Sequence, residues 1–199
     1  MAKGTIGEYA IQLCRRAIGN FLENSTALSL AENEVPLKAL KEKKGCFVTL
    51  HKGGELRGCI GNIGANAALY ESIARNAALA AFNDPRFAPL SAKEFPAIDI
   101  EVSVLSKPVA LRYKSPQELL KKLNRKKGVI ICKGGRSATF LPQVWTHVKG
   151  KEQFLSELCM KAGLGSDGWK GKGLCVQTYT VKAYKEKRVD KQAMAIPGF

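Results

Sequence analysis

Two apolar segments, each divided by a Lys-Gly-Gly turn, constrain the fold of this chain more than any other feature. The first spans residues 46–60 around Gly53-Gly54, and the second spans residues 128–141 around Gly134-Gly135. Turns that match the twist of paired strands need positive φ angles, which glycine adopts without steric cost. We therefore expect two β-hairpins, with strands at about 46–51, 56–60, 128–133 and 136–141.

Apolar residues at helical spacing predict four helices around these hairpins. The predicted ranges are about 6–23, 67–82, 115–124 and 151–162. Thr5 and Glu8 have the spacing of a capping box, and Asn66 is expected to cap the second helix. Two further strands are predicted at 98–104, where apolar and polar residues alternate, and at 174–183.

The order of these elements decides the fold class. Helices and strands do not alternate strictly, as they would in a parallel βαβ sheet, and the hairpins require antiparallel pairing. The sequence therefore predicts an α+β fold with a mixed, largely antiparallel sheet and flanking helices. A length of 199 residues, 45% of them hydrophobic, suits a single domain over residues 1–199.

Composition limits both the compartment and the chemistry. No apolar run approaches the roughly 20 residues that span a bilayer, and the N-terminal residues lack the pattern of a signal peptide. We therefore expect a cytoplasmic protein without membrane contact. The six cysteines occur singly, without the paired spacing of a zinc site. Nucleotide-binding, zinc-peptidase and serine-hydrolase motifs do not occur either, so the sequence predicts neither a metal nor a cofactor.

The formal net charge of +15 is large for a chain of this length. It is compatible with an ordinary solvated surface, or with binding of RNA or of an acidic protein. The basic residues are dispersed, and aromatic residues are not interleaved with them, which argues against the stacking that single-stranded RNA binding uses. The main clusters are 41–44, 121–127 and 182–188.

Residues 56–64 form the most unusual segment of the chain. Strand side chains alternate in direction, so Arg57 and Cys59 are expected on one face and Gly58 on the other. The glycines leave backbone N–H groups accessible, and a neighbouring guanidinium favours the thiolate form of a cysteine. Cys59 is therefore a candidate nucleophile or redox group, and Arg57, Gly58 and Gly61 are candidate ligand contacts. Simple packing beneath a helix is the alternative.

A cysteine nucleophile needs a nearby base, and the chain has only two histidines. A two-residue turn at Gly53-Gly54 would place His51 on the face opposite Cys59. His147 follows a proline-containing segment that the sequence does not position. A Cys-His mechanism therefore has little support from the sequence.

An enclosed Arg57 would need a carboxylate partner, because an unpaired charge is costly to bury. Asp84, Asp99 and Glu101 are the candidates, since each lies in a segment that otherwise has little reason to carry a charge. Such a group would be either purely structural or part of a pocket.

Two proline-containing segments supply further candidates. The loop at 84–89 is expected to be braced by Asp84, a role that is sufficient by itself, and ligand contact by Arg86 is the alternative. Gln143 and Trp145 follow the proline that ends a predicted strand, and an aromatic ring beside an amide suits ligand recognition. Burial of Trp145 in the core is the alternative.

Five segments in order resemble the AMMECR domain family, over about residues 5–184. The last two resemble its prokaryotic branch. The segments are Leu56-Arg57-Gly58-Cys59-Ile60-Gly61, Asp84-Pro85-Arg86-Phe87, Glu101-Val102-Ser103-Val104-Leu105-Ser106, Leu141-Pro142-Gln143-Val144-Trp145 and Lys161-Ala162-Gly163-Leu164.

This resemblance implies a larger α+β lobe and a smaller lobe, here about residues 108–170, with the signature residues near a cleft between them. It also implies action together with a Memo-like protein and a radical S-adenosylmethionine protein, but no particular reaction. Three hypotheses follow: an accessory component that binds a ligand or partner, an enzyme that uses Cys59, and an RNA-binding module. The candidate site residues are Arg57, Gly58, Cys59, Gly61, Asp84, Arg86, Glu101, Gln143 and Trp145.

Overall fold

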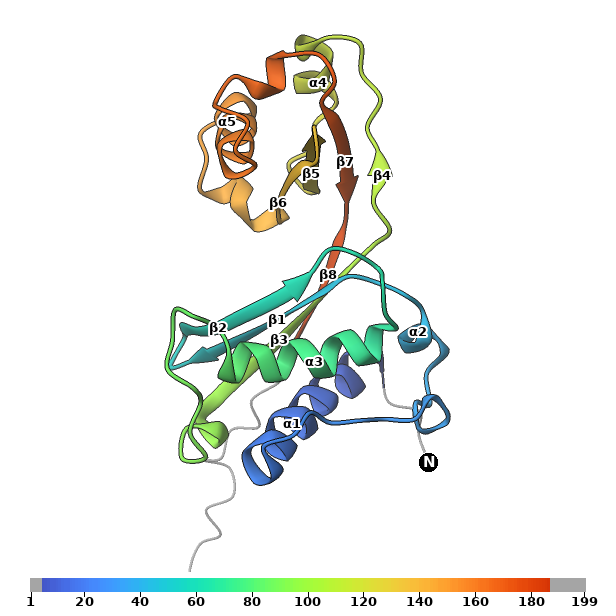
Figure 1. Ribbon diagram of the computed structural model, residues 1–199, viewed down its shortest axis with the longest axis vertical. Helices are drawn as coiled ribbons and strands as arrows, with labels where there is room; N and C mark the ends of the chain where they lie inside the picture. Colours follow the sequence, from blue (N-terminus) through green and yellow to red (C-terminus); the bar gives the residue numbers. More distant parts are fainter. Residues whose placement is uncertain (1–4, 187–199) are drawn as a thin grey trace, which may run out of the picture. The chain divides into compact units, whose positions relative to one another are not determined.

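The chain forms two compact units in the computed structural model, which describes residues 5–186 (Figure 1). Unit 1 contains the described residues up to Val104 and those from Ala183 onward, and unit 2 contains Leu105–Lys182. Unit 2 is thus inserted into the sequence of unit 1. Each unit has its own sheet, helices and apolar core. Lys187 and Arg188, which end the third basic cluster, lie outside the described residues.

Unit 1 is a four-stranded sheet with two long helices on one face (Figure 1). The strand order is β2-β1-β3-β8, and β1 pairs antiparallel with both β2 and β3. β8 runs antiparallel to β3, because Lys185 lies beside Glu101 while the next residue, Glu186, donates its N–H to Ile100 O. The elements are α1 (Ile6–Asn24), β1 (Cys46–Lys52), β2 (Glu55–Asn62), α3 (Leu69–Phe82), β3 (Ile98–Leu105) and β8 (Val181–Lys185).

The core of unit 1 lies between this sheet and its helices. Alternation along β1 directs Cys46, Val48 and Leu50 into the core, where all three are fully buried. Ile73 and Ala77 from α3 belong to the same buried cluster. The small side chains of α3 allow its backbone to approach the sheet closely, which matters for the site described below.

Unit 2 contains the second four-stranded sheet, in the order β4-β7-β5-β6. Its neighbouring strands pair antiparallel. Val129, Ile131 and Val176 from the sheet pack with Phe154 and Leu158 from α5 to form the core. The elements are β4 (Val109–Ala110), α4 (Pro116–Lys122), β5 (Gly128–Lys133), β6 (Arg136–Phe140), α5 (Lys151–Lys161) and β7 (Cys175–Tyr179).

The predicted α+β class, both hairpins and all four helices are confirmed. At the first helix, Thr5 and Glu8 form the predicted capping box. No helix within residues 5–186 is long and apolar enough to cross a membrane. Five further elements are too short to show a hydrophobic period in the sequence. The short elements are η1 (Glu32–Glu34), α2 (Lys38–Lys41), η2 (Phe95–Ala97), η3 (Pro142–Thr146) and η4 (Gly168–Lys170).

Two predicted details were wrong. Asn66 does not cap the second helix: Ala68 occupies the N-cap of α3, and Glu71 Oε2 accepts a hydrogen bond from its N–H at 3.1 Å. The strand predicted at 174–183 is two strands, β7 and β8, which pair in different sheets on either side of Thr180. Consequently the strands divide between two sheets, where a single sheet had been predicted.

Candidate functional site

A β-bulge at Arg57 determines where the candidate side chains lie. In the first hairpin His51 pairs with Leu56, but the next residue of β1, Leu50, pairs with Gly58. Arg57 is therefore an extra residue on β2. Because of this insertion, Leu56 and Gly58 lie on opposite faces of the sheet, whereas strict alternation along a strand would place them on the same face.

The bulge also corrects the predicted position of His51. Cys59 pairs with Thr49, and Thr49 and His51 point the same way because they are two residues apart on β1. His51 therefore lies on the same face as Cys59 rather than on the opposite one. Within residues 5–186, the hydrogen bond recorded for the Cys59 thiol is with Thr49, not with His51.

Cys59 belongs to a polar row that crosses three strands on the face away from the helices. Cys59 lies opposite Thr49, which in turn lies opposite Glu101 on β3. The Thr49 hydroxyl donates to Cys59 Sγ at 3.4 Å. Glu101, 15% exposed, forms an ion pair with Lys185 at 3.3 Å. A hollow of about 330 Å³ on this face is lined in part by His51 and Glu101.

The Arg57 side chain leaves the strand ladder and packs against the loop that precedes β3. Its Nη2 donates to Ala88 O at 2.8 Å and to Glu94 Oε2 at 3.2 Å, and the guanidinium lies 5.8 Å from the Phe87 ring centroid. The side chain is 13% exposed, so the predicted enclosure is confirmed. Its Nη1 atom is buried and has no hydrogen-bond acceptor in the described part of the chain.

The carboxylate partner of Arg57 is Glu94, and the prediction of Asp84, Asp99 or Glu101 was wrong. Glu94 Oε1 also accepts from Lys52 Nζ at 2.8 Å. The hydrogen bonds from Arg57 and then from Lys52 are the largest causes that lower the pKa of Glu94 to about 2. Glu94 is therefore ionised at neutral pH and compensates the buried guanidinium.

Glu94 carries a local sequence signal that differs from those of the charged segments. Ser91 and Glu94 are three residues apart, the spacing of a capping box. In the structure the Glu94 N–H donates to Ser91 Oγ, and the Ser91 N–H donates to Glu94 Oε2, both at 3.3 Å. This turn fixes the glutamate where Arg57 can reach it.

Asp84 secures the outer edge of β2, which among the described residues stands at the end of the strand order. The Cys59 N–H donates to Asp84 Oδ2 at 2.8 Å. The guanidinium of Arg86 donates to the same carboxylate through Nε at 2.9 Å and Nη2 at 2.7 Å. Arg86 first, and then the Cys59 N–H, hold the pKa of the 2% exposed Asp84 well below its usual range. The predicted bracing role of Asp84 is confirmed, since the Arg86 N–H also donates to Oδ1.

Gly58 and Gly61 are sites of close backbone packing. A Cβ atom at Gly58 would lie 2.1 Å from Ala80 O on α3, and one at Gly61 would lie 2.2 Å from the Phe47 ring. These contacts explain why glycine occupies both positions. Their role as ligand contacts stays a prediction.

The remaining candidates, Gln143 and Trp145, belong to unit 2. Trp145 is 5% exposed, stacks on Phe154 with ring centroids 3.5 Å apart, and donates from Nε1 to Lys127 O at 2.9 Å. It is therefore a core residue, which was the alternative to ligand recognition. Gln143 is exposed, and its backbone carbonyl oxygen accepts a hydrogen bond from the Thr146 hydroxyl.

The thiols differ in their surroundings. Cys14, Cys46 and Cys159 are buried, Cys59 and Cys132 are half-buried, and Cys175 is exposed. Burial raises the pKa of Cys46 to about 11. Among residues 5–186, no group of three or more His, Cys, Asp or Glu side chains is arranged to hold a metal ion.

Fold and site together define a two-unit α+β protein in which an enclosed arginine and a half-buried thiol flank the bulged edge of a sheet. Comparison with known proteins gives the family. The AMMECR1 family model matches residues 11–184. The chain therefore belongs to the AMMECR1 family.

Several relatives match over nearly their whole length. Protein MK0488 of Methanopyrus kandleri is 37% identical over 190 residues, covering 91% of this chain and 88% of the relative. A protein of Methanosarcina mazei is 36% identical over 197 residues, covering 98% of each chain. The crystal structure of an uncharacterized protein, PH0010 from Pyrococcus horikoshii, superposes with a TM-score of 0.80 at 34% identity, covering 91% of both chains.

Proposed function

We propose that this protein is an accessory component that binds a ligand or a partner protein at the bulged edge of β2. It would act together with a Memo-like protein and a radical S-adenosylmethionine protein, as the family resemblance implies. The contacts would come from Arg57 and Arg86 at the edge and from Cys59 and Glu101 on the adjoining face.

The observation that carries this proposal is the unmet donor on Arg57. Its Nη1 atom is buried without an acceptor among the described residues, although Nη2 and Nε are bonded. An unsatisfied buried donor costs roughly 1–3 kcal/mol. In this conformation the atom is closed to solvent, so a ligand or partner that presents a carbonyl or carboxylate oxygen must displace the loop that carries Ala88 and Glu94 in order to remove this cost.

The polar row supports binding more than thiol catalysis. A nucleophilic cysteine is usually activated by a base within about 2.6–3.2 Å. Here the thiol contacts the hydroxyl of Thr49, and its backbone N–H is held by Asp84. Neither group is a base suited to deprotonating the thiol, because Asp84 accepts from three other donors of Arg86.

The test is the affinity of the full chain for the purified Memo-like protein from the same organism, measured by biolayer interferometry. Arg57→Lys keeps a cation that can pair with Glu94 but replaces the three guanidinium nitrogens, Nη1 among them, by a single ammonium group. We expect affinity at least tenfold weaker than wild type, which corresponds to about 1.4 kcal/mol.

Arg16→Lys, on the exposed side of α1, is the matched control and should leave the affinity unchanged. Melting temperatures of both variants establish that they are folded. If folded Arg57→Lys binds as tightly as wild type, or if wild type does not bind at all, the proposed function is wrong.

A further inference from the structure

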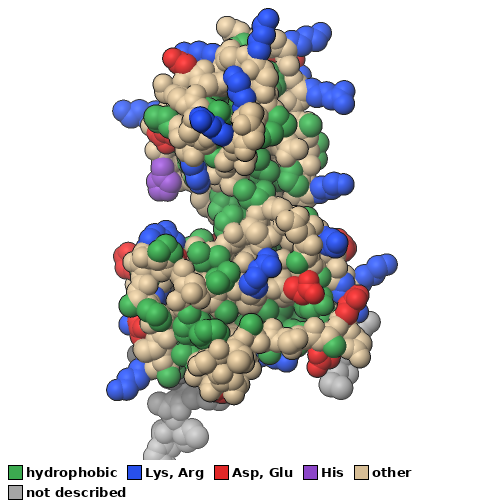
Figure 2. Space-filling model, viewed as in Figure 1, with side chains coloured by type: hydrophobic (Ala, Val, Ile, Leu, Met, Phe, Trp, Pro, Cys, Tyr) green, Lys and Arg blue, Asp and Glu red, His purple; other side chains and the backbone are tan. Residues whose placement is uncertain are grey.

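Unit 2 carries most of the positive charge of the chain. Leu105–Lys182 contains 16 Lys and Arg against four Asp and Glu, a net charge of +12 out of +15, which leaves +3 for all other residues. The expectation that the charge is dispersed along the chain was therefore wrong. Figure 2 shows Lys and Arg side chains projecting around this unit, with few Asp or Glu side chains on the face in view.

Part of this charge surrounds one hollow of about 610 Å³ in unit 2. Two segments line it, residues 110–116 after the start of β4 and residues 169–176 before and within β7. They contribute four cationic side chains and no carboxylate. These cations are Arg112, Lys114, Lys170 and Lys172.

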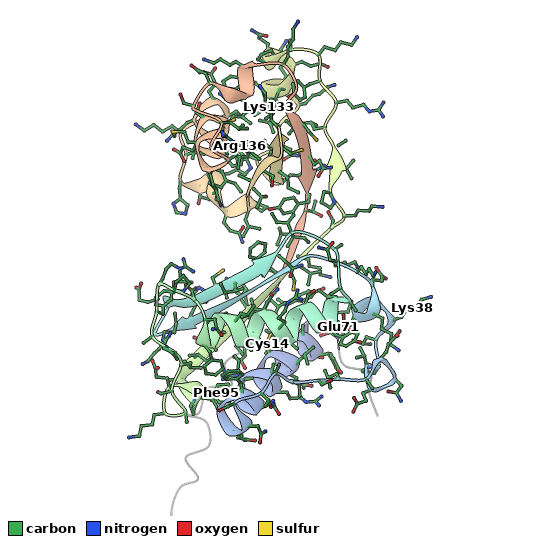
Figure 3. The ribbon with its side chains drawn as sticks, viewed as in Figure 1. Cys14, Lys38, Glu71, Phe95, Lys133 and Arg136 are labelled. Atoms are coloured by element: carbon green, nitrogen blue, oxygen red, sulfur yellow. The ribbon has the colours of Figure 1, made fainter. Side chains whose placement is uncertain are left out.

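Two more lysines lie beside the hollow. Lys122 Nζ donates to Arg112 O at 2.8 Å. Lys133, labelled in Figure 3 near Arg136 on the β5–β6 hairpin, approaches the Gly171 backbone so closely that a Cβ there would lie 3.2 Å from Nζ. We call these six side chains together the cationic surface: Arg112, Lys114, Lys122, Lys133, Lys170 and Lys172.

Carboxylates neutralise only part of the cationic surface. Lys122 pairs with Glu118 at 2.7 Å and Lys170 with Asp167 at 2.8 Å. Among the described residues, the other four cations have no ion pair with a carboxylate. Like charges around one hollow repel one another, and salt screens this repulsion over a Debye length of about 8–10 Å. A polyanion that binds here would relieve that repulsion.

The aromatic residues near the hollow are not available for base stacking. Trp169 is 3% exposed and donates from Nε1 to Ser156 Oγ. Tyr113 is half-buried, and its hydroxyl donates to Leu174 O at 2.8 Å. Single-stranded nucleic acids are bound largely through exposed aromatic rings. The surface is therefore suited to phosphates rather than to unstacked bases.

Apolar anchors of the kind that protein interfaces use are also scarce. Hot spots in such interfaces are large apolar or aromatic side chains that enter a partner's pocket. In unit 2 the exposed large hydrophobic residues are Val109 and Met160, and neither lines the hollow. An acidic protein would gain electrostatic attraction at this surface but few apolar contacts, whereas a phosphate backbone can bind through electrostatic attraction alone.

We propose that the cationic surface of unit 2 binds the phosphate backbone of double-helical nucleic acid without reading its sequence. Phosphate contacts of this kind release counterions, so affinity falls steeply with salt. They supply register and orientation but no base specificity, so duplexes of equal length and different base sequence should bind alike. This surface belongs to unit 2 and the Arg57 site to unit 1, and the test of the surface does not depend on the proposed function.

The experiment is fluorescence anisotropy of a labelled 20-base-pair RNA hairpin and of a DNA duplex of equal length, titrated with the full chain at several KCl concentrations. One variant carries Arg112→Gln, Lys114→Gln, Lys170→Gln and Lys172→Gln. Each lost phosphate contact lowers the slope of log affinity against log salt by about 1. We expect the slope to fall by about 3–4, and affinity at 100 mM KCl to weaken at least 30-fold.

The control removes the same charge from unit 1, through Arg16→Gln, Lys38→Gln, Lys43→Gln and Lys93→Gln, all exposed positions. It should weaken binding less than threefold, and melting temperatures verify both folds. Equal losses in the two variants would mean that net charge alone attracts nucleic acid. Poly-glutamate that binds as tightly as the hairpin would instead identify an acidic-protein surface. Either result would overturn the proposal.

Discussion

Gly58→Ala is expected to lower the free energy of unfolding by about 3 kcal/mol, at the upper end of the range for overpacked cores. The added Cβ would lie 2.1 Å from Ala80 O and 3.1 Å from Ala80 C. Both atoms belong to the backbone of α3, so neither a rotamer change nor a small side-chain shift relieves the clash. Either α3 or β2 must move, and β2 carries Arg57 and Cys59. Chemical denaturation followed by circular dichroism measures the change.

Gly19→Ala is the matched control for this prediction, because it makes the same chemical change where space is available. Gly19 lies within α1, and the nearest atom to its added Cβ would be Phe95 Cε1 at 3.7 Å, an ordinary contact. Alanine is favoured over glycine in a helix by roughly 0.5–1 kcal/mol, so this variant should be more stable than wild type. Similar effects for the two variants would contradict the close packing of β2 on α3.

Asp84→Asn should destabilise the protein by about 2–4 kcal/mol, the cost of disrupting a buried and multiply bonded charge. Asp84 accepts from the Cys59 N–H and from three donors of Arg86. Asparagine keeps one acceptor oxygen but turns an N–H₂ group toward donors. The edge of β2 should then loosen, which faster amide hydrogen exchange at Cys59 would reveal.

Asp167→Asn is the control, since Asp167 pairs with Lys170 at a similar distance but lies exposed on the surface. It should leave stability unchanged. The acid response gives a second readout. Folding lowers the pKa of Asp84, so its contribution to stability is complete above the pKa of an aspartate in the unfolded chain, about 3.9. This contribution is lost as the pH falls below that value. Wild type should therefore lose more stability than Asp84→Asn below about pH 4. Parallel curves would show that this carboxylate is not strongly held.

The sequence was sufficient for the elements whose signals are local. Paired glycines at positive φ define both hairpin turns, and the capping box of Thr5 and Glu8 begins α1 as expected. The division at Thr180 was not predictable, because apolar and polar residues continue without interruption from β7 into β8. Only the pairing partners, which are distant in sequence, separate the two strands.

At the site, the enclosure of Arg57 and the bracing by Asp84 could be predicted, but the bulge could not. A bulge shifts the register by one residue, and the extra residue, Arg57, has a partner that local sequence does not reveal. That partner is Glu94, which is 37 residues away in a loop. An error of one residue was enough to place His51 on the wrong face. The net charge of unit 2, in contrast, follows from the sequence alone once the boundaries of the unit are known.

The most direct test of the Arg57 site is protection of Cys59 when the Memo-like protein binds. Alkylation of the full chain by iodoacetamide, quantified for each cysteine by mass spectrometry, measures how accessible the Cys59 thiol on β2 is to the reagent. The account predicts that saturating partner slows Cys59 alkylation at least tenfold while Cys175, exposed in unit 2, reacts as before. An unchanged Cys59 rate within a fully formed complex would show that partners bind elsewhere.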